Sequence, residues 1–196
     1  MGHYFVNDDN LRSNRHQFEV TIVSHKFVFN TDVGVFSKCH IDFGTKLLLE
    51  NIEYDKVNGT ILDIGCGYGP IGIVLAKLTN CFIHMVDINL RALALVEINA
   101  KLNGVNNILI YESNMFDNVN HIFNMIVTNP PIRAGKKIVY EMMVKAKDYL
   151  TDDGSLWFVI RKQQGAESLI KYLSDIYELA IVKKKKGYFV VKARKI

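Results

Sequence analysis

The chain has 196 residues, of which 49% are hydrophobic and 22% are charged, and its formal net charge is +4 at pH 7. This length and apolar content suit one folded domain with a substantial core, and they exclude an intrinsically disordered chain. The sequence contains neither a run of about 18 apolar residues nor a secretory leader, so we expect no contact with a membrane.

The cysteines bear on the cellular compartment. Cys39, Cys66 and Cys81 are odd in number and show no CxxC spacing, so neither a disulfide framework nor a zinc site is expected. The histidines likewise lack the spacing of metal ligands, and we predict no metal. Unpaired thiols suit a reducing compartment, which predicts a cytoplasmic protein.

Residues 1–52 differ in pattern from the rest of the chain. Short alternating segments there are typical of a β-hairpin, and a brief helix follows them. We expect them to form an N-terminal extension that belongs, with the core at 53–196, to one single domain spanning 1–196. The elements expected are strands at 18–23 and 26–30, a turn at Ser24-His25, and a helix at 46–51 opened by residues 42–45.

From residue 60 onward, buried strands alternate with helices. Each strand is a short and nearly continuous apolar run, as in parallel sheets that are covered on both faces. The pattern predicts an α/β fold with a doubly wound, mostly parallel, seven-stranded sheet and an antiparallel C-terminal hairpin. Strands are expected at 60–64, 82–87, 108–111, 124–128, 156–160, 179–182 and 188–191, the last two joined through 183–187. Helices are expected at 70–78, 90–103, about 165–175, and 137–150, which a turn at 152–154 would close.

A glycine-rich loop at 63–69 connects the first of these strands to the first helix, where glycines let a ligand press against the backbone. Residues 67–72 also match the GxGxxG pattern of dinucleotide-binding folds, so NAD has to be considered. Asp63, however, would repel a pyrophosphate and would suit a ligand that carries an ammonium and a sulfonium. Asp87, at the end of the second strand, is placed to accept hydrogen bonds from two ribose hydroxyls. The pattern therefore favours S-adenosylmethionine over NAD.

The segment Asn129-Pro130-Pro131-Ile132 follows the fourth strand and faces the same edge of the sheet. Two prolines fix the backbone, so the Asn129 side-chain carbonyl and the Pro130 backbone carbonyl gain defined directions. Two converging acceptors suit an exocyclic amine on a planar ring, because they can turn its lone pair toward a sulfonium methyl group. We therefore expect N-methylation, with the proton leaving after the transfer.

These motifs carry a resemblance that covers nearly the whole chain. The sequence resembles class I S-adenosylmethionine-dependent methyltransferases of the small methyltransferase-domain family, and within it the 16S ribosomal RNA guanine-N2 methyltransferases. The resemblance implies a Rossmann-like methyltransferase fold, RNA binding and a role in ribosomal RNA processing by methylation. The segments that carry it are 34–37, 42–45, 63–69, 86–89, 129–136 and 183–188.

The resemblance also implies roles for single residues, with Asn129 and Pro130 as the catalytic pair. The expected cofactor-binding residues are Ser37, Thr45, Asp63, Gly65, Cys66, Gly67, Gly69, Asp87, Ile88, Asn114 and Asn129 itself. The expected substrate-binding residues are Pro131, Ile132, Arg133, Lys136, Lys183, Lys184, Lys185 and Lys186.

Two positions depart from the family pattern. Relatives often have Asp where this chain has Asn114, which can still accept a hydrogen bond from an adenine amine, although more weakly. Relatives often have an aromatic residue where this chain has Ile132, a change that favours guanine over adenine or a glutamine amide.

Enzymes of this branch can consist of two fused halves, of which this chain would be the catalytic one. We expect either a monomer or a weak homodimer.

The positive charge is concentrated in one segment. Residues 183–196 contain seven Lys or Arg and no acid, whereas the rest of the chain carries 17 basic and 20 acidic residues. This asymmetry is typical of a local patch for RNA, but lysines on an edge strand can equally serve to block aggregation.

Three functions remain open at this point. The leading hypothesis is a methyltransferase acting on small-subunit ribosomal RNA. The second is a protein-glutamine or small-molecule N-methyltransferase on the same core, against which the basic segment and Ile132 argue. The third is a non-catalytic RNA-binding factor, against which Asp63, Asp87 and Asn129 argue.

Overall fold

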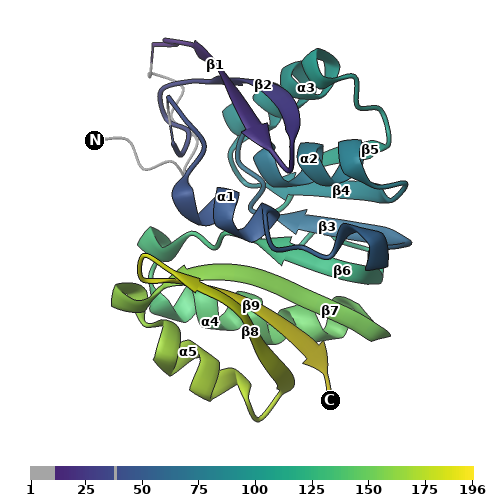
Figure 1. Ribbon diagram of the computed structural model, residues 1–196, viewed down its shortest axis with the longest axis vertical. Helices are drawn as coiled ribbons and strands as arrows, with labels where there is room; N and C mark the ends of the chain where they lie inside the picture. The colour runs from purple at the N-terminus through teal and green to yellow at the C-terminus, as the bar shows by residue number, and fades with distance from the viewer. Residues whose placement is uncertain (1–11, 38) are drawn as a thin grey trace.

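The computed structural model describes residues 12–37 and 39–196. In this part of the chain a seven-stranded sheet carries helices on both faces, and a separate two-stranded sheet lies beside it (Figure 1). No helix among these residues is long and apolar enough to cross a membrane. The strands are β1 (His16–Ile22), β2 (His25–Thr31), β3 (Thr60–Ile64), β4 (Phe82–Asp87), β5 (Ile108–Glu112), β6 (Phe123–Thr128), β7 (Leu150–Arg161), β8 (Tyr177–Lys185) and β9 (Tyr188–Lys195). The helices are α1 (Phe43–Leu49), α2 (Pro70–Leu78), α3 (Leu90–Asn103), α4 (Lys136–Lys145) and α5 (Ala166–Leu173), with 3-10 turns at Tyr54–Lys56, Ile132–Ala134, Ala146–Tyr149 and Lys162–Gln164.

The strands of the large sheet follow the order β5-β4-β3-β6-β7-β9-β8. Neighbouring strands from β5 to β7 are parallel, whereas β9 runs antiparallel to both β7 and β8. The predicted doubly wound sheet is therefore confirmed, together with its antiparallel C-terminal hairpin and the small N-terminal hairpin. The chain leaves β3 toward β4 on one side and later returns to β6 on the other. Ligands of such sheets bind beyond the strand ends at this reversal.

Two hydrophobic clusters, one on each face, hold the sheet between its helices. Helices α1, α2 and α3 contribute to the first cluster, and α4 and α5 contribute to the second. Strand β3 shows why its sequence is almost wholly apolar, because Ile61 is buried in the first cluster while Leu62 and Ile64 are buried in the second. A strand covered on both faces needs apolar side chains at successive positions.

Two side-chain amides attach the β1–β2 hairpin to helix α3. Asn99 and Asn103 lie one turn apart on α3, and both are buried. Asn99 accepts the N–H of Asn30 at 2.7 Å and donates to the Asn30 carbonyl at 3.0 Å. Asn103 makes the same two contacts with Val28, at 3.0 and 2.7 Å. The amides thus replace a neighbouring strand along β2, and they fix the start of the segment that leads into α1.

The end of the fourth predicted helix differs from expectation. The turn expected at 152–154 as the end of a helix over 137–150 is wrong, because α4 ends at Lys145 and β7 already begins at Leu150. Leu150 is buried and paired with β6, while regular pairing resumes only at Ser155, so the residues between them bulge out of the ladder. Burial of Leu150 outweighs the turn-forming residues that follow it.

Both hairpin turns differ from the prediction: the C-terminal turn is shorter than expected, and the N-terminal turn lies one residue earlier. Lysines 183–185 belong to β8, and only Lys186 and Gly187 connect it to β9. Their φ angles of 49° and 77° are positive, as a two-residue turn that matches the twist of the strands requires. The N-terminal hairpin likewise turns at residues 23–24, so His25 is already the first residue of β2.

Candidate active site

A cavity of about 510 Å³ lies at the carboxyl ends of β3, β4, β6 and β7. It sits where the strand order reverses, which is the position expected for a ligand in this fold. Its walls come from the loops after these strands and after β5, and from the beginnings of α1 and β9. Segments far apart in the sequence thus meet at one end of the sheet (Figure 1).

The glycine loop presents bare backbone to this cavity. Gly65 and Gly67 have φ angles of +69° and +57°, and a Cβ added at either would meet nothing within 4 Å. A ligand can therefore approach the backbone closely here. Gly69 differs, because its added Cβ would lie 3.0 Å from Ile73 and Met85, and it does not line the cavity. Gly69 serves the packing of α2 against β4.

Asp87, at the end of β4, lines the cavity and holds the glycine loop in place. Its Oδ2 accepts the N–H of Gly67 at 2.8 Å, and its Oδ1 accepts the N–H of Asn89 at 2.9 Å. Burial raises the pKa of Asp87, and these hydrogen bonds oppose the rise. The backbone N–H of Ile88 bonds to it as well, but a carboxylate has about four lone-pair sites, so Asp87 can still accept a hydrogen bond from a ligand hydroxyl.

Asp63 lies beneath the glycine loop and is fully buried. Its Oδ2 accepts the N–H of Gly72 at 2.8 Å, whereas its Oδ1 has no hydrogen-bond partner among the described residues. Burial raises the pKa of Asp63 to about 7; the hydrogen bond from Gly72 opposes the rise, and the charge of Asp87 adds to it. A buried acceptor without a partner is costly, so positive charge on a ligand in the adjacent cavity would stabilise this carboxylate.

Asn129 comes directly after β6, and the N-terminal segment orients its side-chain amide. Its Nδ2 donates to Asp42 Oδ2 at 3.1 Å and to Thr45 Oγ1 at 2.9 Å. A carboxylate only accepts, so the contact with Asp42 identifies the amide nitrogen. Both amide hydrogens are thereby used, and Oδ1 is the acceptor that Asn129 offers to the cavity it lines. Asp42 also caps α1 by accepting the N–H of Thr45 at 3.2 Å.

The two prolines form a tight turn after Asn129. Pro131 has φ −75° and ψ 77°, close to an inverse γ-turn, and the Pro130 carbonyl accepts the N–H of Ile132 at 2.8 Å. The second acceptor expected from the sequence is thus already engaged once, but a carbonyl oxygen has a second lone pair. Ile132 and Arg133 then line the cavity.

A further part of the wall comes from β7, β9 and α1. Arg161 and Tyr188 are paired across β7 and β9, and the Arg161 guanidinium lies 5.1 Å from the centroid of the Tyr188 ring. The Phe43 ring lies 5.3 Å from that of Tyr188. Arg161 belongs to no motif, and its place at the end of a parallel strand is the one signal in the sequence that could have revealed it.

Most residues expected in the site do line this cavity. They are Thr45, Gly65, Cys66, Gly67, Asp87, Ile88, Asn114, Asn129, Pro130, Pro131, Ile132 and Arg133. The others, Ser37, Asp63, Gly69, Lys136 and lysines 183–186, lie outside its lining. Ser37 instead donates a hydrogen bond to the carbonyl of His40. Burial raises the pKa of the Cys66 thiol, which disfavours the reactive thiolate.

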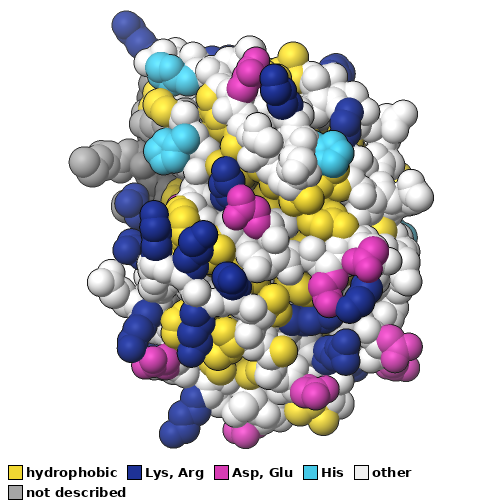
Figure 2. Space-filling model, in the orientation of Figure 1, with side chains coloured by type: hydrophobic (Ala, Val, Ile, Leu, Met, Phe, Trp, Pro, Cys, Tyr) yellow, Lys and Arg dark blue, Asp and Glu magenta, His cyan; other side chains and the backbone are white. Residues whose placement is uncertain are grey.

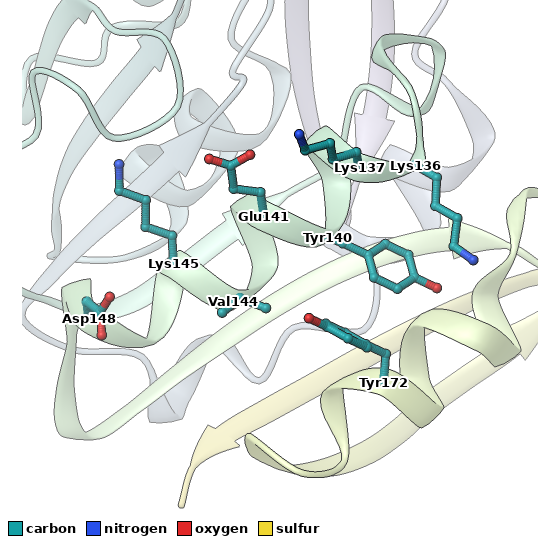
Figure 3. A pocket seen from close by; sticks show the side chains of 8 residues that line it. All are labelled: Lys136, Lys137, Tyr140, Glu141, Val144, Lys145, Asp148 and Tyr172. Atoms are coloured by element: carbon teal, nitrogen blue, oxygen red, sulfur yellow. The ribbon is translucent and has the colours of Figure 1, made fainter.

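Lys136 lies in a second, more open groove of about 870 Å³ along α4 (Figure 3). Tyr140 of α4 and Tyr172 of α5 point toward each other there, with ring centroids 4.9 Å apart. The Lys136 Nζ atom lies 5.0 Å from the Tyr140 ring centroid. Glu141 and Asp148 line the groove as well, so it lacks the one-sided positive charge of a nucleic-acid channel.

Lysines 183–186 project from β8 and its turn, and all four are exposed. None of them forms an ion pair with a carboxylate in the described part of the chain. Lys186 Nζ lies 5.2 Å from the Phe43 ring, which contacts Tyr188 of the cavity wall. Figure 2 shows Lys and Arg side chains gathered at this end of the sheet, on the left of the view.

Two other basic residues of the segment 183–196 are neutralised by acids from elsewhere in the chain. Lys192 pairs with Glu53 at 3.0 Å, and Lys195 pairs with Asp152 at 3.4 Å. The unpaired positive charge of the segment is therefore shifted toward the β8–β9 turn and the cavity.

Comparison with known proteins identifies relatives of this chain. Residues 26–192 match the profile of the methyltransferase small domain. The chain is 45% identical over 198 residues to the uncharacterized protein YbxB of Bacillus subtilis, covering 99% of this chain and 98% of that protein. It is 32% identical over 160 residues to ribosomal RNA small subunit methyltransferase C of Vibrio cholerae, covering 79% of this chain and 44% of that protein. Among solved structures, the T. thermophilus 16S rRNA N2 G1207 methyltransferase (RsmC), in complex with AdoMet and guanosine, matches with a TM-score of 0.83 and 24% identity over 95% of this chain and 52% of that one.

Fold and site together define a Rossmann-like methyltransferase. The chain belongs to the methyltransferase small domain family, which confirms the resemblance found in its motifs. It spans about half the length of the methyltransferase C proteins that it matches.

Proposed function

We propose that this methyltransferase methylates the exocyclic N2 amine of a guanine in small-subunit ribosomal RNA. The observation that carries the proposal is the fixed amide of Asn129, whose Oδ1 is the acceptor left to the cavity. An amine on an aromatic ring donates hydrogen bonds and is a weak nucleophile. An oriented acceptor both holds such an amine and helps to expose its lone pair.

S-adenosylmethionine is the cofactor of this methyltransferase. When bound, it supplies a methyl group on a positively charged sulfur. The open backbone of the glycine loop, the remaining acceptor site of Asp87 and the buried carboxyl group of Asp63 beneath the loop all fit this molecule. We assign Asp63, Gly65 and Gly67 to its methionine part, Asp87 to its ribose, Ile88 and Asn114 to its adenine, and Ser37, Thr45, Cys66 and Gly69 to the shape of the site.

In this mechanism the chain acts by positioning. Asn129 Oδ1 and the second lone pair of the Pro130 carbonyl accept the two N–H bonds of the target amine. A bond forms between nitrogen and the methyl carbon while the carbon–sulfur bond breaks, and the nitrogen becomes positively charged. The two carbonyl oxygens stabilise that charge. The surplus proton then leaves to water, so no strong base is needed.

The exposed lysines of the β8–β9 hairpin and the similarity to ribosomal RNA methyltransferases both support RNA as the substrate. Among the unpaired lysines 183–186, Lys186 lies against Phe43, which contacts Tyr188 of the cavity wall, and a phosphate backbone neutralises such a run of lysines by releasing counterions. The relatives from V. cholerae and T. thermophilus are named as methyltransferases of small-subunit ribosomal RNA. We assign Pro131, Ile132, Arg133, Lys136 and the four lysines to contacts with the substrate.

The proposal also covers the organisation of the enzyme. Asp42 and Thr45 hold Asn129 from the N-terminal side, so we propose that residues 1–52 and 53–196 act as one domain. We place this domain in the cytoplasm, where its cysteines stay free thiols, and propose that it works as a monomer or a weak homodimer.

A labelling experiment tests the proposed function. The protein is incubated with methyl-labelled S-adenosylmethionine and with small ribosomal subunits or naked RNA from a strain that lacks the enzyme. Label is expected on N2 of a guanine in the small-subunit RNA. Label on a protein glutamine or a small metabolite would replace the proposal with the second hypothesis, and RNA binding without transfer would replace it with the third.

Replacing Asp87 with alanine is expected to weaken cofactor binding about tenfold or more. The variant loses charge-assisted hydrogen bonds to the ribose, each worth about 1.5–3 kcal/mol. Isothermal titration calorimetry measures the effect, and Asp175→Ala, which removes an exposed carboxylate, is the control. Wild-type affinity in Asp87→Ala would contradict the assignment.

Cofactor affinity is expected to fall by up to tenfold per pH unit as the pH drops below about 7. Asp63 is protonated below its raised pKa, and the positive charge that the cofactor brings above the glycine loop favours the ionised carboxylate beneath it, so binding must expel a proton there. Calorimetry from about pH 5.5 to 7.5 follows this dependence, which Asp63→Asn should flatten. The pKa of Asp87 is also raised, so an unchanged slope in Asp63→Asn together with a flat one in Asp87→Asn would assign the proton to Asp87.

A further inference from the structure

A row of three residues lies along the open end of the sheet: Asn129, which directly follows β6, Arg161 of β7 and Tyr188 of β9. Thr128 is paired with Phe158, and Arg161 is paired with Tyr188. Arg161 therefore lies two residues, or roughly 6–7 Å, beyond the level of Asn129. Because side chains alternate along a strand, both residues share the face that α1 covers. All three residues line the cavity.

Aromatic rings, and not an acid, support the Arg161 guanidinium. It lies 5.1 Å from the centroid of the Tyr188 ring, which in turn packs against Phe43. Gly44 makes room for this arrangement, because an added Cβ would lie 2.9 Å from Tyr188 Cε1. No carboxylate among the described residues forms an ion pair with Arg161. Its fork of N–H donors is thus held at the cavity wall without an acidic partner.

The cavity consequently offers an acceptor at Asn129 Oδ1 and a fork of donors at Arg161. Guanine has the complementary arrangement, because its N2 amine donates at one edge while O6 and N7 accept at another. Adenine carries an amine in place of O6, which would face the donors of the guanidinium. Building on the proposed function, we infer that Arg161 recognises the target base by donating to O6 and N7 while the N2 amine lies against Asn129.

The test compares RNA with guanine at the target position and RNA with 2,6-diaminopurine there. Diaminopurine keeps the N2 amine but replaces O6 with an amine. The wild-type enzyme should prefer guanine by roughly 10- to 100-fold in kcat/KM. Arg161→Gln, whose amide can donate or accept, should lower that preference to about threefold or less. Arg194→Gln is the matched control, because Arg194 is exposed and pairs with Ser155 at the opposite end of β7.

An Arg161→Gln enzyme with the wild-type preference for guanine would overturn the inference. So would equal losses on both RNAs with a salt slope reduced by about one, because that pattern assigns Arg161 to a phosphate. Cofactor affinity measured without RNA should be unchanged in Arg161→Gln, which separates a base contact from a damaged cavity. If the wild-type enzyme binds the cofactor but methylates neither RNA, the proposed function itself fails, and the inference falls with it.

Discussion

Asn129→Ala is expected to lower kcat by about 100- to 1000-fold while changing the Kd of S-adenosylmethionine by less than about threefold. The reason lies in the hydrogen bonds of Asn129. Asp42 and Thr45 occupy its amide nitrogen, so its oxygen is left for the substrate amine. Removing that oxygen takes away an acceptor that matters most as positive charge develops on the nitrogen. Single-turnover kinetics and calorimetry measure the two quantities.

Asp42→Ala should show a smaller loss of the same kind. Without the carboxylate, the Asn129 amide keeps only the contact with Thr45 and can rotate, so kcat falls while cofactor affinity persists. Asn106→Ala, at an exposed position, is the matched control and should behave as wild type. Activity of Asn129→Ala within a few-fold of wild type would remove Asn129 from the catalytic step.

Replacing lysines 183–186 with glutamine is expected to weaken RNA binding by about 100-fold or more near 0.1 M salt, and to flatten the salt slope by about three. Four charges that contact phosphates on single-stranded RNA would each release counterions, and the described part of the chain offers these lysines no acidic partner. Cofactor affinity should stay unchanged. Filter binding at several salt concentrations measures both the affinity and the slope.

A second quadruple variant controls for bulk charge. Lys26, Lys56, Lys101 and Lys171 are exposed and lie outside the β8–β9 hairpin. Their replacement with glutamine removes the same charge and should leave the slope nearly unchanged. If the two variants change the salt slope equally, lysines 183–186 do not bind RNA specifically. Their role would then be to protect the edge strand β8 from pairing with another chain.

The architecture could be predicted from the sequence because its signals are local. A continuous apolar run such as 60–64 indicates a strand buried on both faces, and the glycine loop at 63–69 indicates where that strand ends and the next helix begins. Boundaries were less accurate where packing decides them. Leu150 starts β7 because it is buried against β6, although Asp152, Asp153 and Gly154 favour a turn.

The candidate site was predictable in its strand-end residues and not in their partners. Asp87 and Asn129 follow strands, so the topology alone brings them together. The bond from Asn129 to Asp42 joins residues 87 positions apart, and no spacing in the sequence encodes it. Lys192 and Glu53 are likewise far apart in the sequence. Their ion pair neutralises a lysine that the sequence alone suggests to be unpaired. The burial of Asp63 beneath the loop could not be predicted either, because the sequence does not show whether an acidic side chain at a strand end faces a ligand or the core.

The position of β9 makes the two halves of the site depend on different contacts. One half lies at β3 and β4, and the other lies at β7 and β9. β3 and β4 are consecutive in the chain and adjacent in the sheet, so the cofactor half grows from local units. β8 and β9 also form locally as a hairpin, but β9 is the strand that joins the hairpin to β7. Arg161 and Tyr188 therefore meet only when the finished hairpin docks. The part of the cavity wall that this pair forms thus depends on long-range contacts of the C-terminal hairpin, whereas the glycine loop and the strand ends beside it rest on neighbours close in the chain.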